Sequence, residues 1–282
     1  MEKQEYQQLI EPLSKEVFDR LMCPDCRADL EYKQTLFRCL GCGRTFPIIN
    51  GVIQMVPGSW LRDHHDLLNQ TDTAASQATD KTKSTQYETL RFQTRRSIKR
   101  NVCEQSIVNQ FLEQHPEGIW VLDVPCGMGR FNDVLARYRM KVLSIDKRLW
   151  RAASTLSKTC GPSTLAIHGD ALSLPFRDNS VDVALCVRLT HHLDRERLGA
   201  LLRELGRVSP EVLITFYNVH TIRAQYRKLK KFLRGKQPAY SYSLSCMREM
   251  AAKAGLSITD HVSPFGILHR PIQFLRLKRV QL

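Results

Sequence analysis

Four cysteines near the N-terminus have the type and spacing of a metal site. Cys23 and Cys26 form one C-x2-C pair, and Cys39 and Cys42 form a second pair after twelve intervening residues. Each pair can close a tight turn with both sulfurs facing one point, so the two pairs together supply four thiolates. Four thiolates leave no open coordination position, which predicts a structural zinc ion and not a catalytic one.

The rest of the chain favours this metal interpretation over disulfides. The N-terminus reads MEKQEYQQLIEPLSKEV, which is polar and lacks the apolar core of a signal peptide. The sequence also contains no apolar run long enough for a transmembrane helix. We therefore expect a cytoplasmic protein without a transmembrane segment, whose five other cysteines are buried thiols.

A second chemical feature is the stretch VLDVPCGMGRF, residues 121–131. It predicts a strand that runs into a turn, where Gly127 and Gly129 bring backbone N–H groups close to a ligand at a helix start. Pro125 keeps the preceding residue extended and gives up only one N–H group. Cys126 has no paired base in the sequence, so we interpret it as a packed small residue and not as a nucleophile.

Two further carboxylates follow at intervals that suit a nucleotide-like cofactor. Asp146 ends the next apolar run, twenty-three residues after Asp123, where a carboxylate can bind ribose hydroxyls. Asp170 ends the run after that. Each has a structural alternative, because Asp146 could cap the following helix and Asp170 could belong to a turn. The dinucleotide pattern G-x-G-x-x-G is incomplete, because Asn132 replaces its third glycine.

The elements that must position these residues alternate in type from residue 118 onward. We expect strands at 119–124, 141–146, 164–170, 181–187 and 211–217, with helices before residue 138, near 150–158 and at 195–208. Such alternation predicts an α/β domain with a parallel sheet, which binds ligands beyond the carboxyl ends of its strands. Before it, residues 87–114 predict one or two helices with an inward face of Ile98, Val102, Ile107, Val108, Phe111 and Leu112.

Residues 18–57 resemble a known zinc-ribbon family. The order CP-x-C, predicted hairpin, C-x2-C-G, aromatic-Pro-Ile and Asn-Gly-Val-Ile is similar to the small zinc ribbons that activate partner methyltransferases of the translation machinery. That family works as a partner or as a fused module. The resemblance therefore implies a methyltransferase connection but does not settle it.

Residues 118–217 resemble the class I S-adenosylmethionine (SAM) methyltransferases, specifically the type 11 group, through VLDVPCGMGR, VLSIDKR and HGDALSLPFRDNSVDVALCV. The resemblance implies a Rossmann-like, seven-stranded α/β sheet beside a small N-terminal zinc-ribbon domain. We expect a zinc ribbon with a flanking helix at 1–58, a linker at 59–86 and the methyltransferase domain at 87–282. The linker interpretation rests on the near absence of large apolar residues in 69–86.

The family assigns roles to matching residues of this sequence. It implies that Asp123, Gly127 and Gly129 hold the methionine end of SAM, with Cys126 in the same loop. It further implies that Asp146 binds the ribose, that Asp170 and Ala171 meet the adenine, and that Val187 and Arg188 line the cofactor and substrate side. The family pattern is D-x-G-x-G-x-G, and Pro125 replaces its first glycine.

The residues RLTHHL, 188–193, follow the fourth predicted strand, where the methyl acceptor should arrive. His191 or His192 could act as the base, since histidine titrates near neutral pH. The alternative is that one packs and the other is solvated. No Asn/Asp-Pro-Pro-aromatic motif of DNA amino-methyltransferases follows this strand, and Cys126 and Cys186 lie in the wrong places for a cytosine C5 nucleophile.

The charge of +14 favours an anionic acceptor or surface; the alternative is a solvated basic surface that only keeps the protein in solution. Residues 212–248 contain no acid, and a basic insertion is expected at about 218–240. Its helical face of Ile222, Tyr226, Leu229 and Phe232 or Leu233 could rest on a membrane surface or pack against the domain. Three interpretations remain open. The first is an enzyme that methylates an O or N atom of a small or lipid-linked molecule and contacts a membrane surface. The second is an RNA base methyltransferase, and the third is a non-catalytic SAM-binding scaffold.

Overall fold

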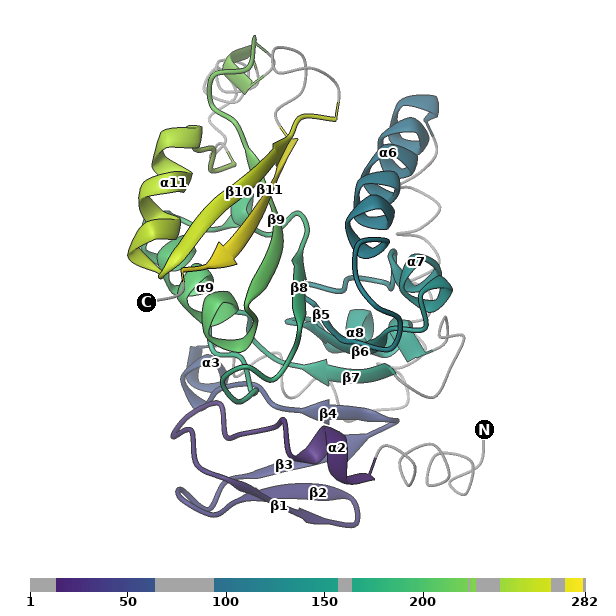
Figure 1. Ribbon diagram of the computed structural model, residues 1–282. Helices are drawn as coiled ribbons and strands as arrows, with labels where there is room; N and C mark the ends of the chain where they lie inside the picture. Colours follow the sequence, from purple (N-terminus) through teal and green to yellow (C-terminus); the bar gives the residue numbers. More distant parts are fainter. Residues whose placement is uncertain are drawn as a thin grey trace. The chain divides into compact units, whose positions relative to one another are not determined.

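A computed structural model of the chain describes residues 14–63, 94–156, 164–222, 224–226, 239–264 and 272–280. They divide into two compact units (Figure 1). Unit 1 comprises Met1–Trp120 and Cys126–Arg177, and unit 2 comprises Val121–Pro125 and Asp178–Leu282. Residues 64–86 of the expected linker lie outside the described residues, and the expected domain boundaries stay a prediction.

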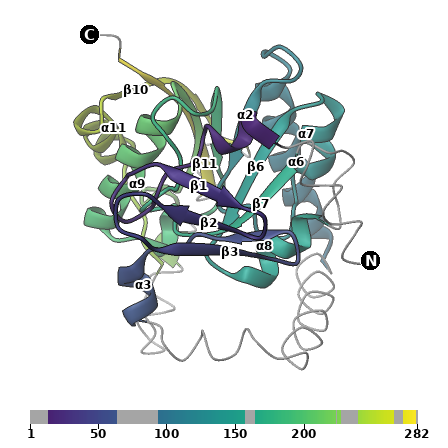
Figure 2. The ribbon, with the colours of Figure 1, turned by 90° about the horizontal axis from the view of Figure 1, so that it is seen from below.

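The N-terminal part of unit 1 is a small antiparallel sheet. Its elements are α2 (Ser14–Phe18), β1 (Leu30–Lys33), β2 (Leu36–Cys39), β3 (Thr45–Ile49), β4 (Val52–Gln54) and α3 (Gly58–Asp63). The hairpin predicted between the two cysteine pairs is confirmed, because β1 pairs antiparallel with β2 from Leu30↔Cys39 to Lys33↔Leu36. Figure 2 shows β1, β2 and β3 side by side.

This small sheet continues directly into the strands that follow it in unit 1. β6 (Lys141–Asp146) pairs in parallel with β7 (Thr164–His168), and β4 pairs in parallel with the other edge of β7. The strand order in unit 1 is therefore β1-β2-β3-β4-β7-β6. β6 is buried over five of its six residues, which explains its nearly continuous apolar sequence. The cysteine-bearing segment is thus built into the sheet of unit 1.

Helices α6 (Arg95–Leu112), α7 (Asn132–Arg137) and α8 (Leu149–Leu156) complete unit 1. α8 packs Ala152 against Val52 of β4 and Ala166 of β7, so one helix covers both strands at the point where the small sheet joins the parallel strands. α6 begins at a capping box in which the Thr94 side chain accepts from the N–H group of Ser97.

The predicted inward face of α6 is half correct. Ile107, Val108, Phe111 and Leu112 are buried, but Ile98 and Val102 are 49% and 59% exposed. The helix packs against α7, for example through the bond from the Arg137 guanidinium to Asn109 Oδ1 at 2.8 Å. An apolar pattern at helical spacing predicts which residues share a face, but not how far that face is covered.

Unit 2 is a mixed sheet with helices α9 (Arg195–Val208) and α11 (Leu244–Lys253) packed together on it (Figure 1). Its strands are β5 (Trp120–Asp123), β8 (Val183–Cys186), β9 (Glu211–Tyr217), β11 (Ile272–Arg279) and β10 (Leu256–Val262), in this spatial order. β5, β8 and β9 run parallel, whereas β11 is antiparallel to both β9 and β10. The carboxyl ends of β5, β8 and β9 therefore share one edge.

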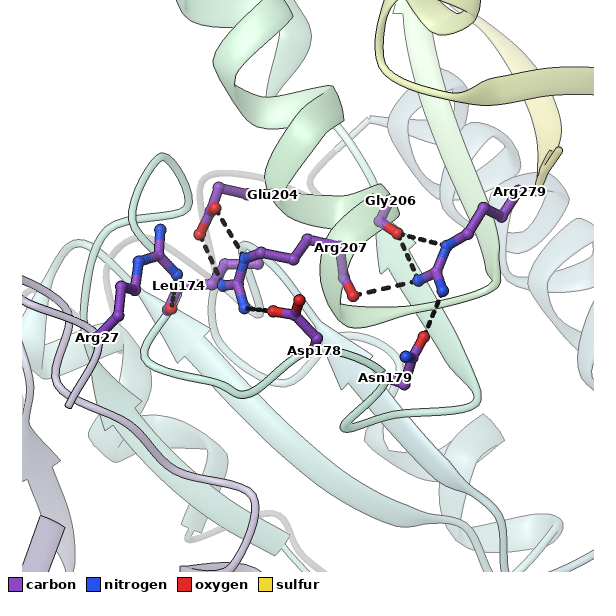
Figure 3. Close-up of polar contacts among 8 residues, drawn as sticks. All are labelled: Arg27, Leu174, Asp178, Asn179, Glu204, Gly206, Arg207 and Arg279. Atoms are coloured by element: carbon purple, nitrogen blue, oxygen red, sulfur yellow. Dashed lines mark hydrogen bonds and ion pairs between the residues drawn. The ribbon is translucent and has the colours of Figure 1, made fainter. Parts of the chain in front are cut away.

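A cluster of arginines holds the C-terminal end of α9 (Figure 3). The Arg279 Nε donates to the carbonyl of Gly206 at 2.8 Å, and one of its Nη atoms donates to the carbonyl of Arg207 at 3.1 Å. Arg207 itself pairs with Glu204 and Asp178, each at 2.9 Å. The final carbonyls of a helix have no partner within it, so Arg279 satisfies groups that would otherwise need water.

Candidate cofactor and acceptor site

The loop after β5 has the open glycine geometry that the sequence predicts. Gly127 and Gly129 have φ angles of +56° and +67°, a region that glycine adopts without a steric penalty. A Cβ atom on Gly129 would lie 2.8 Å from the Asn132 side chain, whereas one on Gly127 would meet no described atom within 4 Å. The loop therefore has free space beside Gly127, where a ligand can approach the backbone.

Asp146 lies directly beside this loop at the end of β6. Its Oδ2 accepts from the N–H group of Gly127 at 3.0 Å, and its Oδ1 accepts from that of Arg148 at 2.9 Å. Burial raises the pKa of the carboxyl group, while these N–H groups and the nearby Arg151 counteract the rise. Each oxygen uses one lone pair in these bonds, so the carboxylate can still accept hydrogen bonds from two ligand hydroxyls.

Asp170 organises the turn after β7. Its Oδ1 accepts from the N–H group of Leu172 at 3.0 Å, and its carbonyl accepts from that of Ser173 at 3.1 Å. Asp170 therefore is a turn residue, which was the alternative to a binding role. Its Oδ2 atom is not used in this turn and can accept a hydrogen bond from a ligand. Ala171 lies half-buried in the same turn.

The cysteine-bearing segment supports this turn from the other side. Ser173 Oγ donates to the carbonyl of Pro24 at 2.6 Å, and the N–H group of Met22 donates to the carbonyl of Pro175 at 3.0 Å. Arg27 adds a bond to the carbonyl of Leu174 at 3.4 Å (Figure 3). The residues around Cys23 and Cys26 thus fix the backbone that follows Asp170.

His168 makes a second connection between the two parts of unit 1. Its Nδ1 lies 2.8 Å from Gln54 Oε1 of β4, and its Nε2 lies 3.1 Å from the carbonyl of Lys147. Burial lowers the pKa of His168 to about 4, so the ring is neutral at pH 7 and its single N–H group donates to one of these two oxygens. It connects β4 to the residue immediately after Asp146.

The four cysteine sulfurs form one cluster in which all lie within 4.8 Å of one another. Cys23 and Cys42 are 3.7 Å apart, and Cys26 and Cys39 are 3.4 Å apart. A tetrahedron of Zn–S bonds of about 2.3 Å places its sulfurs about 3.8 Å apart, so the cluster has the dimensions of a zinc site. The four residues are thus positioned to hold one ion.

Two of the predicted cofactor-binding residues, Asp123 and Val187, lie in unit 2. Asp123 is fully buried at the end of β5, opposite Leu185 of β8. Val187 is buried directly after β8. Cys186 is fully buried, and burial together with the charge of Asp123 raises the pKa of its thiol. A buried neutral thiol is inert, in agreement with its exclusion as a nucleophile.

His191 and His192 form a short 3-10 helix, η2 (Thr190–His192), on the edge of unit 2 after β8. The His191 ring stacks on Tyr217, with centroids 4.5 Å apart and planes inclined by 7°. The His192 ring is 4.0 Å from that of His191 and is more exposed. The N–H group of Tyr240 donates to the carbonyl of His191 at 3.0 Å, so the end of the basic insertion is attached to the same edge.

Most of the basic insertion lies outside the described residues, including the positions from Arg227 to Lys236 and Arg223. Ile222 and Tyr226, two members of its expected apolar face, are 68% and 62% exposed. Leu229 is not among the described residues. The expected amphipathic helix therefore stays a prediction.

The contacts that join α6 to the glycine loop could not be predicted from the sequence. Arg130 forms a 2.5 Å ion pair with Glu104, which is fully buried. The Gln105 side chain donates to the carbonyl of Arg130 at 3.0 Å. These contacts join residues about 25 positions apart, and one isolated acid in a helix does not reveal its partner.

We predict that Glu104→Gln destabilises the protein by about 3 kcal/mol or more, because it leaves the guanidinium of Arg130 buried without its counter-ion. Urea unfolding measures the loss. Glu117→Gln is the control, since its pair with Arg139 is exposed on both sides and should change stability by less than about 0.5 kcal/mol. Equal effects of the two substitutions would contradict this assignment.

Comparisons with known proteins identify the class of domain. Residues 121–210 match the family model described as a methyltransferase domain. The chain is 29% identical over 166 residues to tRNA (carboxymethyluridine(34)-5-O)-methyltransferase alkbh8 of Xenopus tropicalis, which covers 56% of this chain and 25% of the relative. It is 29% identical over 135 residues to the mouse protein of the same description, covering 45% and 19%. The chain thus spans a quarter or less of these curated relatives.

Solved structures show the same fold. Magnesium protoporphyrin IX methyltransferase from Synechocystis PCC 6803 with bound S-adenosylhomocysteine (SAH) has a TM-score of 0.54 and 18% identity, covering 64% of this chain and 84% of its own. The PH0226 protein of Pyrococcus horikoshii has a TM-score of 0.53 and 15% identity, covering 66% and 92%. The predicted α/β, Rossmann-like methyltransferase fold is confirmed.

Residues 121–210 therefore carry a methyltransferase domain. Its N-terminal cysteine cluster is compatible with a small zinc-binding domain. In the described part of the chain, no helix combines the length and the apolar character that crossing a membrane requires.

Proposed function

We propose that this protein transfers the methyl group of SAM to an oxygen or nitrogen atom of an RNA nucleotide. The observation that carries the methyltransferase assignment is the buried Asp146 carboxylate bonded to the N–H group of Gly127, next to free space in the loop. This pairing places a ribose-binding acid beside a backbone that can approach a cofactor. Asp146 and Gly127 therefore define the cofactor side of the site.

The residues of this chain fit SAM. We propose that Asp123, Cys126, Gly127 and Gly129 hold its methionine end, that Asp146 binds the ribose, and that Asp170, Ala171 and Val187 line the remaining cofactor surface. When bound, SAM supplies an electrophilic methyl group on a positively charged sulfur. The acceptor would take this methyl group by displacing the sulfur, and SAH would be the second product.

In such an in-line displacement, the protein mainly aligns the acceptor and removes a proton where the acceptor carries one. We propose that His191 or His192 takes this proton. The stacking of His191 on Tyr217 restrains its ring, whereas His192 is the more exposed of the two. Both follow β8 at the edge where the carboxyl ends of the parallel strands meet.

We further propose that Cys23, Cys26, Cys39 and Cys42 bind one structural zinc ion and that residues 1–58 form a zinc ribbon fused to the methyltransferase domain at 87–282, with 59–86 between them. The support is the sulfur cluster and the hairpin between its two cysteine pairs. The small sheet of this ribbon supports the turn after Asp170 through Pro24 and Met22.

Two observations favour RNA as the acceptor. The formal charge is +14. The Xenopus tropicalis and mouse relatives carry names that state a tRNA substrate. Dense positive charge attracts a phosphate backbone. A small or lipid-linked anionic acceptor is the second candidate, because the exposed Ile222 and Tyr226 at the start of the basic insertion offer an apolar surface.

The test is a transfer assay with methyl-labelled SAM against total cellular tRNA, ribosomal RNA and extracted lipids. We expect label in an RNA fraction, with transfer that falls steeply as salt rises. A quadruple change of Arg227, Lys228, Lys230 and Lys231 to Glu should depress this transfer but preserve SAH affinity. Label in the lipid fraction alone would favour the second candidate and contradict the first.

A further inference from the structure

Arg188, the second residue after β8, has a backbone conformation that is unusual for an arginine. Its φ angle is +67°, in the left-handed region. There the Cβ atom of any residue other than glycine approaches the backbone, so the conformation is unfavourable. Strained residues of this kind persist only where the surroundings enforce them, and they concentrate at functional sites.

Two buried threonines enforce the conformation. The N–H group of Arg188 donates to Thr215 Oγ1 at 2.7 Å, and Thr190 Oγ1 donates to the carbonyl of Thr215 at 2.8 Å. Thr190 and Thr215 are each 1% exposed. The two bonds fix the chain on both sides of Leu189, so the turn after β8 has a defined shape.

Glycine would satisfy the same backbone bond at lower cost. The donor to Thr215 is a main-chain N–H group, which glycine also possesses. The chain uses glycine at other left-handed positions, including Gly127 and Gly129. Residues other than glycine also occupy left-handed positions, among them Arg27 and Arg139, so the conformation of Arg188 stands out through its place directly after β8 and through the two buried threonines that hold it.

Arg188 lies on the edge of unit 2 that carries the two histidines. It follows the buried Val187 and is itself half-buried. On the same edge, His191 stacks on Tyr217, two residues beyond Thr215 in β9. This edge is where the acceptor is expected, and a guanidinium binds phosphate oxygens through two parallel hydrogen bonds.

We propose that Arg188 is a specificity-determining residue that binds a phosphate group of the acceptor RNA next to the methylated nucleotide. The inference rests on the proposed function. The two threonine bonds fix the backbone of Arg188 three residues before His191, so that a phosphate on its side chain would fix the position of the neighbouring nucleotide. Arg188 then acts on acceptor binding and leaves cofactor binding unchanged.

The test compares Arg188→Gly with Arg139→Gly. Arg139 also has a left-handed φ, of +51°, but lies at the end of α7 in an exposed pair with Glu117. Both substitutions relieve backbone strain, which offsets part of what the lost side chains contribute, so both melting temperatures should stay within a few degrees of the wild type. Only Arg188→Gly should raise the KM for total tRNA, by about ten-fold or more, because it loses charge-assisted hydrogen bonds. Calorimetric affinity for SAH should be unchanged in both.

The outcomes separate the two proposals. If the wild type transfers methyl groups to RNA and Arg188→Gly has an unchanged KM, the inference is wrong and the proposed function stands. A loss of SAH affinity, or a melting temperature several degrees lower, would show that the side chain serves the cofactor or the fold. No transfer to RNA by the wild type would overturn both. Arg188→Lys should raise KM less than Arg188→Gly does, since lysine keeps the positive charge but cannot form two parallel hydrogen bonds.

Discussion

Replacing Asp146 with alanine should weaken the binding of SAH by about ten-fold to a hundred-fold. The carboxylate accepts from the N–H groups of Gly127 and Arg148 and keeps further lone pairs for the ribose hydroxyls. Charge-assisted hydrogen bonds of this kind contribute about 1.5–3 kcal/mol. Isothermal titration calorimetry with SAH measures the change.

Cys126→Ala is the matched control, because Cys126 lies in the same loop and is buried. Its backbone N–H group bonds to the carbonyl of Ile145, and this bond survives the substitution. It should leave SAH affinity within about two-fold of the wild type, since the proposed role of Cys126 belongs to its backbone and its thiol makes only a 3.7 Å contact with the carbonyl of Gly127. If both variants lose affinity equally, the loop geometry and not the Asp146 carboxylate determines binding.

The same carboxylate predicts a pH dependence. Burial raises the pKa of Asp146, so it takes up a proton at a higher pH than an ordinary aspartate does. The ionised form accepts hydrogen bonds from the ribose, and this contribution is lost as the pH falls through the raised pKa. SAH affinity should therefore decline on mild acidification in the wild type, and the decline should be absent in Asp146→Ala.

The second large effect is expected on removal of zinc. The metal contributes most of the folding free energy of small zinc modules, about 10–16 kcal/mol in isolated fingers. Purified protein should contain one zinc per chain, and a thiol-reactive mercurial should release it. Because Pro24 and Met22 hold the turn after Asp170, the zinc-free protein should also lose SAH affinity.

Cys39→Ser should reproduce the zinc loss, whereas Cys246→Ser should not. Cys246 lies on α11, outside the sulfur cluster. The readouts are metal analysis and SAH calorimetry. Less than about half an equivalent of zinc in the wild type would contradict the metal site. A zinc-free protein that binds SAH normally would show that the ribbon does not support the cofactor turn.

The elements with strong local patterns could be predicted from the sequence. α9 spans Arg195–Val208 and β6 spans Lys141–Asp146, as expected from an amphipathic helix and a continuous apolar run. The cysteine spacing also predicted the sulfur cluster. These features depend on residues close together in the chain, so the sequence displays them directly.

Features that depend on distant pairing could not be predicted. The parallel pairing of β4 with β7 joins Val52 to Ala166, and no local pattern specifies which sheet edge a short strand will meet. The sequence predicted a zinc ribbon followed by a linker, and it did not predict that the ribbon strand β4 pairs with β7 in one sheet. Likewise, the left-handed turn at Arg188 depends on Thr215, which is 27 residues away along the chain. The expected burial of Ile98 and Val102 was wrong, because the spacing of apolar residues does not show which part of a helix packs against a neighbour.

A crystal structure of the protein with SAH tests the central claim most directly. We expect one SAH molecule per chain, with its ribose hydroxyls on the Asp146 carboxylate, its homocysteine part along the Gly127–Gly129 loop and its adenine beside Asp170 and Ala171. SAH bound elsewhere, or no binding at millimolar concentration, would contradict the assignment of this loop and these carboxylates as a cofactor site.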